Sequence, residues 1–328
     1  MRVNDKKPAV FIGPLANLLD KFIAHKQSLG YKYHTGAEAL TIFDAYSVEQ
    51  DAPPDTLGKR LVEGWVKKRD GETANTQQTR ITVIRQFAIF MRDLGFNAYV
   101  LPYRRGLQPK SYAPYVFTRV EIEAILTSAD NQPVFGQYPQ SHITTPALLR
   151  LLYGCGLRVS EALKLKISDV NLDEGIIKVI DSKFGRDRLI PLSESLTLYL
   201  RHYAELMRFG DSTEYFFPNR RGGMLTPSGA YSRFRALLWQ SGISHGGRGK
   251  GPRLHDLRHT FSVHSLAGMV AQGMDIYCAL PVLATYLGHE KLSTTGQYVR
   301  LTAEMYPEVI SAVEKSCGMI FPEEVSGE

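Results

Sequence analysis

The chain has 328 residues, 44% of them hydrophobic and 22% charged, so it is long enough for two domains with hydrophobic cores. A net charge of +6 and a pI of about 9.1 favour a nucleic-acid partner. The three cysteines form no Cys-x-x-Cys pair, and the sequence has neither a signal peptide nor a long apolar run. We therefore expect a cytoplasmic protein without disulfides and without membrane contact.

The first 98 residues are predicted to form a separate all-α domain. Hydrophobic residues follow a helical pattern over residues 14–29, 36–46, 56–66 and 76–94. We expect Thr56 to cap the third of these helices, in which Trp65 belongs to the core. Residues 1–112 carry 17 Lys and Arg against 11 Asp and Glu, whereas the remaining residues carry 22 of each. The excess positive charge therefore lies in the N-terminal third.

The helical period breaks up between residues 99 and 116. Three prolines alternate there with three basic residues: Pro102, Arg104, Arg105, Pro109, Lys110 and Pro114. Prolines at this spacing favour an extended chain. We predict a basic linker that can lie along a phosphate backbone.

Residues 117–328 are predicted to form an α+β domain, mainly helical with a small β-sheet. Thr118 and Glu121 make a capping-box pattern at its first helix, and residues 131–145 are expected to be a surface loop. Further helices are expected over residues 146–153, 159–166, 193–207 and 226–240, with a short strand at 215–218. Two β-rich runs, 176–180 and 188–192, predict a hairpin with Lys183 near its tip.

Two motifs in this domain combine cations with a helix start. A Gly-x-Gly break at residues 154–156 precedes a helix whose first turn carries Arg158, and Glu161 lies one turn later, where it can orient that arginine. Further on, His255 and Arg258 are three residues apart, so on a helix they project from one face and can converge on one anion. The glycine-rich stretch 244–253 before them is predicted to be an irregular basic loop.

A third motif adds a nucleophile. Leu287-Gly288-His289 is followed nine residues later by Tyr298, on a segment that Thr294 or Thr295 can cap. Two arginines can hold the non-bridging oxygens of a phosphodiester and oppose the charge of its pentavalent transition state. A tyrosine phenol has a pKa near ~10, so it needs nearby cations and a proton acceptor to attack, and it would be left bonded to the phosphate. These cations replace the electrostatic role of a metal, so we expect no metal and no cofactor.

Six of these residues occur in the order and local context of the tyrosine recombinase family, also called the phage integrase family: Arg158, Lys183, His255, Arg258, His289 and Tyr298. The resemblance extends from about Thr118 to the C-terminus. It implies site-specific cutting and rejoining of DNA through a 3'-phosphotyrosine, with Tyr298 as nucleophile and Lys183 as general acid. His255 would act as base or phosphate ligand, and His289 as a phosphate donor.

The same resemblance implies double-stranded DNA as partner, gripped by the helical domain, and a homo-oligomer that is a dimer on one site and a tetramer in synapsis. An accessory directionality factor is a further candidate partner. The basic residues expected to contact DNA lie in the linker, the hairpin and the glycine-rich loop: Arg104, Arg105, Lys110, Arg186, Arg248, Lys250 and Arg253.

Several alternatives stay open at the level of sequence. A mobile-element enzyme for integration, excision or transposition is expected, and the alternative is a recombinase that resolves multimers of a chromosome or plasmid. A type IB topoisomerase-like enzyme is disfavoured by the Leu-Gly-His motif, and a non-catalytic DNA-binding protein by the six competent side chains.

Some residues near these motifs have plain structural interpretations. Arg188 is expected to belong to a solvated cluster on the hairpin, and His259 and His264 are expected to be structural. Tyr286 competes with Tyr298 as nucleophile but lies in an apolar run, where core packing is more common. Trp239 is likewise expected to be in the core.

Overall fold

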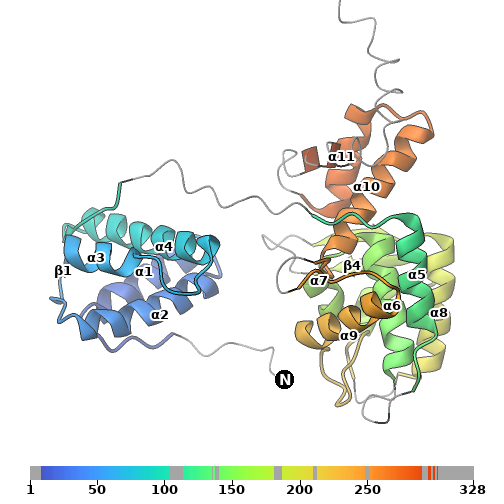
Figure 1. Ribbon diagram of the computed structural model, residues 1–328, viewed down its shortest axis with the longest axis horizontal. Helices are drawn as coiled ribbons and strands as arrows, with labels where there is room; N and C mark the ends of the chain where they lie inside the picture. Colours follow the sequence, from blue (N-terminus) through green and yellow to red (C-terminus); the bar gives the residue numbers. More distant parts are fainter. Residues whose placement is uncertain are drawn as a thin grey trace, which may run out of the picture. The chain divides into compact units, whose positions relative to one another are not determined.

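The computed structural model describes residues 9–102, 114–134, 136, 140–180, 187–209, 213–247, 251–289, 295–296, 298–299 and 301. The chain divides into two units, Met1–Tyr112 and Ala113–Glu328 (Figure 1). The predicted basic linker falls at this division, and its three cations Arg104, Arg105 and Lys110 lie outside the described residues.

Four helices pack together in the N-terminal unit: α1 (Ala16–Ser28), α2 (His34–Glu49), α3 (Lys59–Val66) and α4 (Ala74–Asp93). Their core is aromatic, and the rings of Phe43 and Trp65 meet edge to face with centroids 5.2 Å apart. The prediction that Thr56 caps α3 is wrong. Thr56 belongs to the short strand β1 (Thr56–Leu57), which pairs in parallel with β2 (Asn97–Ala98), and Gly58 precedes the helix instead.

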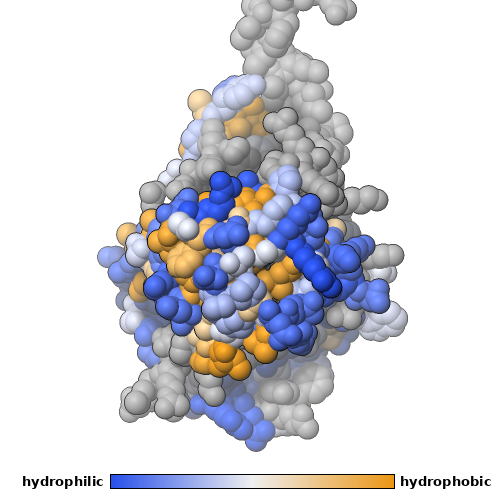
Figure 2. All heavy atoms as spheres, turned by 90° about the vertical axis from the view of Figure 1, so that its left-hand side faces the viewer, coloured by the Kyte–Doolittle hydropathy of each residue, from blue (hydrophilic) through white to orange (hydrophobic). Residues whose placement is uncertain are grey.

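A buried ion pair joins α4 to the turn before it. Arg80 and Glu72 have side chains only 6% exposed, and the Nη2 atom of Arg80 donates to Glu72 Oε2 over 2.6 Å. The same guanidinium donates to the carbonyls of Trp65 and Lys67 at the end of α3. Because this one cation satisfies three acceptors, it holds the end of α3 and the turn before α4 in place. On the outside of this unit, small hydrophobic patches lie between hydrophilic residues (Figure 2).

The C-terminal unit is mainly helical with a small antiparallel sheet, which confirms the predicted α+β class. Its helices are α5 (Arg119–Asp130), α6 (Ser141–Cys155), α7 (Val159–Lys164), α8 (Glu194–Met207), α9 (Pro227–Gln240), α10 (Asp256–Ala271) and α11 (Ile276–Leu287), with a 3-10 turn at Ile167–Asp169. Helix α6 packs against α5, α8 and α10. Thr118 and Glu121 complete both halves of the predicted capping box at the start of α5.

The sheet has the order β3 (Val170–Asn171), β4 (Ile176–Val179) and β5 (Arg188–Pro191). Strands β4 and β5 are antiparallel with Ile177 opposite Ile190, and both of these side chains are buried. The predicted hairpin is therefore confirmed, and β3 extends it. Residues 181–186 between the two strands, which include Lys183 and Arg186, lie outside the described residues.

Two predicted elements of this unit are wrong. The expected loop 131–145 ends earlier, because α6 begins at Ser141 and contains Pro146 inside the helix. Thr144, Thr145 and Pro146 are all buried there, so tertiary packing outweighs the local preference of proline for a helix start. The expected strand at 215–218 is reduced to isolated bridges, one between Lys166 and Tyr215.

Helices α10 and α11 pack against each other and share a hydrophobic core of their own. Val263 and Leu266 of α10 pack with Leu283 and Leu287 of α11, and Tyr298 belongs to the same buried cluster. The four residues between the helices form a tight connection in which Asp275 caps α11. Most of the stretch from Gly268 to Ala284 is therefore helix.

Candidate active site

The guanidinium of Arg258 lies at the centre of the site. It projects from the first turn of α10 and is 2% exposed. Its Nη1 atom donates to the carbonyl of Gly156 over 2.6 Å, and its Nη2 atom donates to the carbonyl of Leu287 over 2.8 Å. Gly156 and Gly288 end α6 and α11 with φ of +57° and +66°, a region that favours glycine. Both glycine motifs therefore turn a helix end towards one arginine.

Arg258 also contacts His289. Its Nη2 atom lies 3.0 Å from His289 Nε2, and His289 Nδ1 lies 2.8 Å from the hydroxyl of Thr295. A guanidinium can only donate, so Nε2 of His289 accepts and its Nδ1 carries the hydrogen that bonds Thr295. Burial and the charge of Arg158 lower the pKa of Arg258 to about 10, and it stays charged at neutral pH.

A carboxylate holds two further arginines beside this centre. Glu161 Oε1 accepts from Arg158 Nη1 over 2.6 Å, and both Nη atoms of Arg188 donate to Glu161 over 3.1 and 2.9 Å. Burial by itself raises the pKa of Glu161, but the hydrogen bonds and charges of Arg188 and Arg158 outweigh it and lower that pKa to about 2. Glu161 is therefore ionised and orients both cations.

The interpretation of Arg188 as a solvated surface residue is wrong. Its side chain is 12% exposed, and a Cβ atom on Gly288 would lie 3.1 Å from its Cδ atom. Arg188 thus joins strand β5 to the Gly-x-Gly-x-Arg helix and to the Leu-Gly-His turn. The sequence held a signal for this inward position. Residues two apart on a strand share a face, so Arg188 lies on the same face of β5 as the buried Ile190.

His255 lies at the N-terminus of α10, immediately before Asp256. His255 is exposed as a whole residue, yet partial burial of its ring and the charge of Arg258 lower its pKa below the ordinary value. Asp256 is fully buried and accepts from the backbone N–H of Arg253 over 2.7 Å and from its Nη2 atom over 3.3 Å. Arg253, a predicted DNA contact, therefore also fixes the start of the helix that presents His255.

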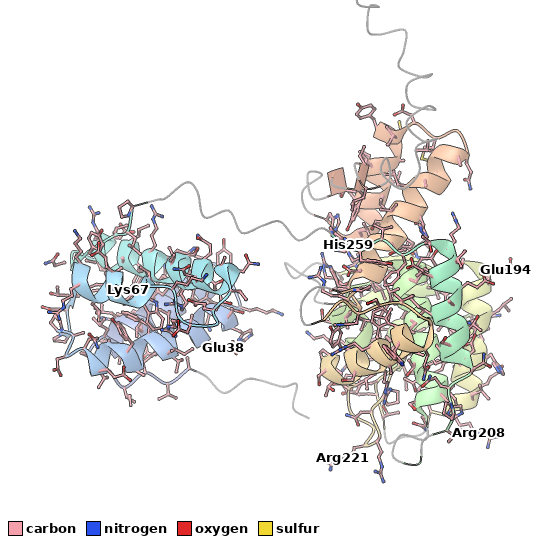
Figure 3. The ribbon with its side chains drawn as sticks, viewed as in Figure 1. Glu38, Lys67, Glu194, Arg208, Arg221 and His259 are labelled. Atoms are coloured by element: carbon pink, nitrogen blue, oxygen red, sulfur yellow. The ribbon has the colours of Figure 1, made fainter. Side chains whose placement is uncertain are left out.

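The predicted nucleophile Tyr298 is buried, and its hydroxyl contacts a histidine outside the predicted catalytic set. Its side chain is only 1% exposed, and its hydroxyl lies 3.2 Å from Nδ1 of His259, which is one turn after His255 on α10. His259 is labelled in Figure 3. The ring of Tyr298 also stacks on His289 with centroids 6.2 Å apart. The phenol is therefore closed off from solvent in this structure. The assignment of His259 to a purely structural role missed this contact.

The structure thus brings five of the six predicted catalytic residues to one place, and Lys183 lies outside the described residues, as do Arg186, Arg248 and Lys250. His264 has a structural setting, since its Nδ1 atom bonds the hydroxyl of Tyr153 over 2.8 Å. Tyr286 donates to the carbonyl of Pro191 over 3.1 Å and is not beside His259.

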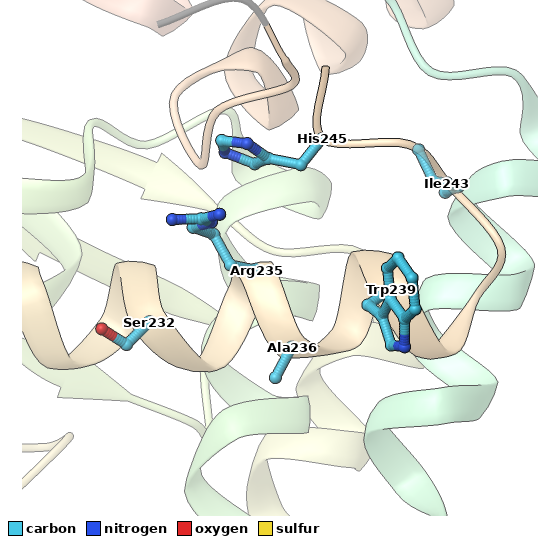
Figure 4. Close-up of a pocket in the computed structure, with 6 residues that line it drawn as sticks. All are labelled: Ser232, Arg235, Ala236, Trp239, Ile243 and His245. Carbon is cyan, nitrogen blue, oxygen red and sulfur yellow. The ribbon is translucent and has the colours of Figure 1, made fainter. Parts of the chain in front are cut away.

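A separate hollow of about 380 Å³ lies along α9 and the loop after it (Figure 4). It is lined by Ser232, Arg235, Ala236, Trp239, Ile243 and His245, and none of them is a predicted catalytic residue. Trp239 is 84% exposed, so the expectation that it belongs to the core is wrong. A helical position next to apolar residues did not reveal which face of α9 is buried.

The described residues contain no group of three His, Cys, Asp or Glu side chains that could hold a metal ion. None of the helices in the described ranges is long and apolar enough to cross a bilayer.

Comparison with known proteins identifies the family. Residues 116–305 match the sequence profile of the phage integrase family. The chain belongs to the phage integrase family. A protein of Sinorhizobium fredii named as an integrase/recombinase, y4rB, is 28% identical over 90% of this chain and 96% of its own length. The tyrosine recombinase XerA of Pyrococcus horikoshii is 32% identical over 70% of this chain and 71% of its own.

Two solved structures share the fold of this chain. The Tn1549 transposon integrase in complex with transposon right end DNA has a TM-score of 0.61 at 18% identity, over 90% of this chain and all of that one. The recombinase XerH bound to its difH substrate has a TM-score of 0.61 at 18% identity, over 84% of this chain and 79% of that one. Together with the named relatives, the family places this chain among the tyrosine-type site-specific recombinases.

Proposed function

We propose that this recombinase cuts and rejoins DNA strands at specific sites through a covalent 3'-phosphotyrosine at Tyr298. One observation carries the proposal. Arg258, His289 and Tyr298 come from three separate segments, yet Arg258 Nη2 lies 3.0 Å from His289 and the His289 ring stacks on Tyr298. A buried arginine, an imidazole and a phenol in a chain of contacts are costly in a packed core, but they suit an attack of the phenol on a phosphodiester that the cation binds.

The two arginines suit the binding of a phosphodiester. Arg158 gives one Nη1–H to Glu161, and its side chain, 20% exposed, carries further N–H donors that suit a non-bridging oxygen. Arg258 adds a buried charge that water screens little. Such fixed charges oppose the negative charge of the transition state without reorganisation, and removing one comparable donor costs about 10²–10³-fold in rate.

The cleavage step has a balanced form. The phenol of Tyr298 gives its proton to a base, its oxygen bonds to phosphorus, and the bond from phosphorus to the 5'-oxygen breaks. The 5'-oxygen takes a proton from a general acid, for which Lys183 is our candidate. We assign His255 to the phosphate or to proton transfer. Rejoining runs the same steps backwards, so no external energy source is needed.

The test is trapping of the covalent intermediate. A nicked suicide DNA substrate, drawn from the native genomic flanks, is incubated with the full chain in EDTA and resolved on a denaturing gel. We expect an adduct with wild type and none with Tyr298→Phe. Tyr286→Phe is the matched control and keeps the adduct, because its hydroxyl bonds the Pro191 carbonyl. Tight DNA binding without any adduct would instead support a non-catalytic DNA-binding protein.

We infer a role in a mobile element, by integration, excision or transposition, and multimer resolution is the alternative. The integrase/recombinase relative, which matches 90% of the chain, supports the first. The XerA and XerD relatives, at 32% and 29% identity, are named only as tyrosine recombinases, so multimer resolution stays the alternative. A plasmid assay separates them. Exchange between two unlike flanking sites would support the mobile element, whereas exchange confined to two copies of one replicon site would support resolution.

The assembly that we propose is a dimer on one DNA site and a tetramer when two sites pair. Solved relatives bound to DNA, among them a lambda integrase dimer on a core site, support it. Sedimentation of the protein with one-site and two-site DNA measures it. A stable single protomer on a two-half-site duplex would contradict it.

A further inference from the structure

The hydroxyl of Tyr298 has an acceptor that the motifs did not indicate. It lies 3.2 Å from Nδ1 of His259, and the ring centroids are 5.8 Å apart. Both residues are held by helix packing, since Tyr298 is part of the α10–α11 core and His259 lies on α10. In the described part of the chain, the histidine rings that contact the Tyr298 ring are those of His259 and His289.

The direction of this hydrogen bond follows from burial. A phenol that is 1% exposed must give its hydrogen to an acceptor, because an unsatisfied buried donor costs about 1–3 kcal/mol. Within the described ranges, Nδ1 of His259 is the acceptor within hydrogen-bond distance of the Tyr298 hydroxyl. His289 is already committed, because its Nε2 atom accepts from Arg258 and its Nδ1 atom bonds Thr295. The Tyr298 hydroxyl therefore donates and His259 Nδ1 accepts.

The surroundings keep His259 able to accept. Burial comes first, and the neighbouring His255, Arg253, Arg258 and His289 add to it, so that the pKa of His259 falls to about 3. The imidazole is thus neutral at working pH and keeps a lone pair. A bound phosphodiester brings negative charge beside Arg258 and offsets this positive field, so the imidazole becomes more basic at the moment when the phenol attacks.

We propose that His259 accepts the phenol proton of Tyr298 during strand cleavage. This inference rests on the function proposed above. As the bond from the Tyr298 oxygen to phosphorus forms, the O–H bond breaks and its proton moves to Nδ1 of His259, while the 5'-oxygen leaves with a proton from the general acid. In rejoining, His259 returns that proton to the departing phenol oxygen.

The chain offers a matched control on the same helix. His264 is buried on the same helix α10, where His259 is half-buried, and its Nδ1 atom bonds a tyrosine hydroxyl, that of Tyr153, over 2.8 Å. Substitution of His264 therefore removes an equivalent packing and hydrogen-bonding unit away from the phenol that reacts. His259→Asn is the conservative variant, because its side-chain oxygen can accept the hydrogen bond without taking a proton, whereas His259→Leu removes both properties.

The experiment measures adduct formation on suicide DNA by the full chain, with either tyrosine or 3,5-difluorotyrosine at position 298. Ring fluorines make the phenol more acidic, so they reduce the need for a proton acceptor. We expect His259→Leu and His259→Asn to slow cleavage by about 10²–10⁴-fold. Difluorotyrosine should restore much of this loss in both variants, and no comparable gain should occur in wild type or in His264→Asn.

Two results would overturn the proposal. A slow His259 variant that difluorotyrosine does not rescue has lost structure, and His259 is then a packing residue. A His259 variant that cleaves faster than wild type shows that this contact holds Tyr298 away from DNA. Failure of the proposed function itself looks different, because wild type would then give no adduct with either amino acid at position 298.

Discussion

Replacing Glu161 by glutamine tests the electrostatic core of the site. Glu161 is 8% exposed, and the hydrogen bonds of Arg188 and Arg158 hold its pKa at about 2 against an ordinary value of 4.5. At about 1.4 kcal/mol per pKa unit, this difference stabilises the folded chain by about 3 kcal/mol at neutral pH. In other proteins, the removal of one partner from a buried ion pair costs about 3–5 kcal/mol, and the value derived for Glu161 lies at the lower end of that range.

The assay is thermal unfolding of wild type and Glu161→Gln by circular dichroism. For a unit of this size, 1 kcal/mol corresponds to roughly 2–4 °C, so the melting temperature should fall by roughly 6–12 °C at pH 7. Because the folded pKa lies below the unfolded one, the stabilisation is complete above about pH 4.5 and is lost as the pH falls towards about 2. The gap between wild type and variant should therefore narrow in that window.

Glu214→Gln is the matched control. Glu214 pairs with Lys166 over 2.9 Å, a distance like those at Glu161, but both side chains are about half exposed, at 56% and 48%. Solvent screens such a pair, so its removal should leave the melting temperature unchanged. Equal shifts for the two variants, or a Glu161→Gln gap that stays constant from pH 7 to pH 3, would refute the reasoning.

Three further predictions concern stability. Gly156→Ala should lower the melting temperature by more than Gly273→Ala, because both glycines have positive φ but only at Gly156 would the new Cβ atom collide with a ring, that of Phe261. Equal shifts would mean that the close contact relaxes. Burial lowers the pKa of His264 to about 4, so the unfolded chain binds a proton there more tightly than the folded chain does. The free energy of unfolding should therefore fall as the pH drops from about 6.5 to about 4. His264→Gln should flatten that fall, measured by urea unfolding at each pH. Trp239→Ser, at an 84% exposed position, should leave the melting temperature unchanged, whereas Trp65→Ser, at 3% exposure, should cost about 3–5 kcal/mol.

Local signals in the chain were sufficient for most helices and for the motifs. The capping box at Thr118 and the serine before α8 mark helix starts, because a side-chain oxygen three residues before a backbone N–H can satisfy it in any context. The β-rich runs around Lys183 likewise predicted the hairpin. Thr56 and residues 141–146 were misjudged, because β-pairing with Asn97 and burial against neighbouring helices overrode the local preference.

The sequence by itself determined which chemical groups are available and in what order: Arg158, His255, Arg258, His289 and Tyr298. Short-range spacing records this information, because a motif is local. Only the tertiary structure decided which groups meet. Arg188 turns inward to Glu161, and His259 receives the phenol of Tyr298 from 39 residues away. Such contacts depend on how α10 and α11 pack with the ends of α6 and β5, and no spacing along the chain encodes that distance.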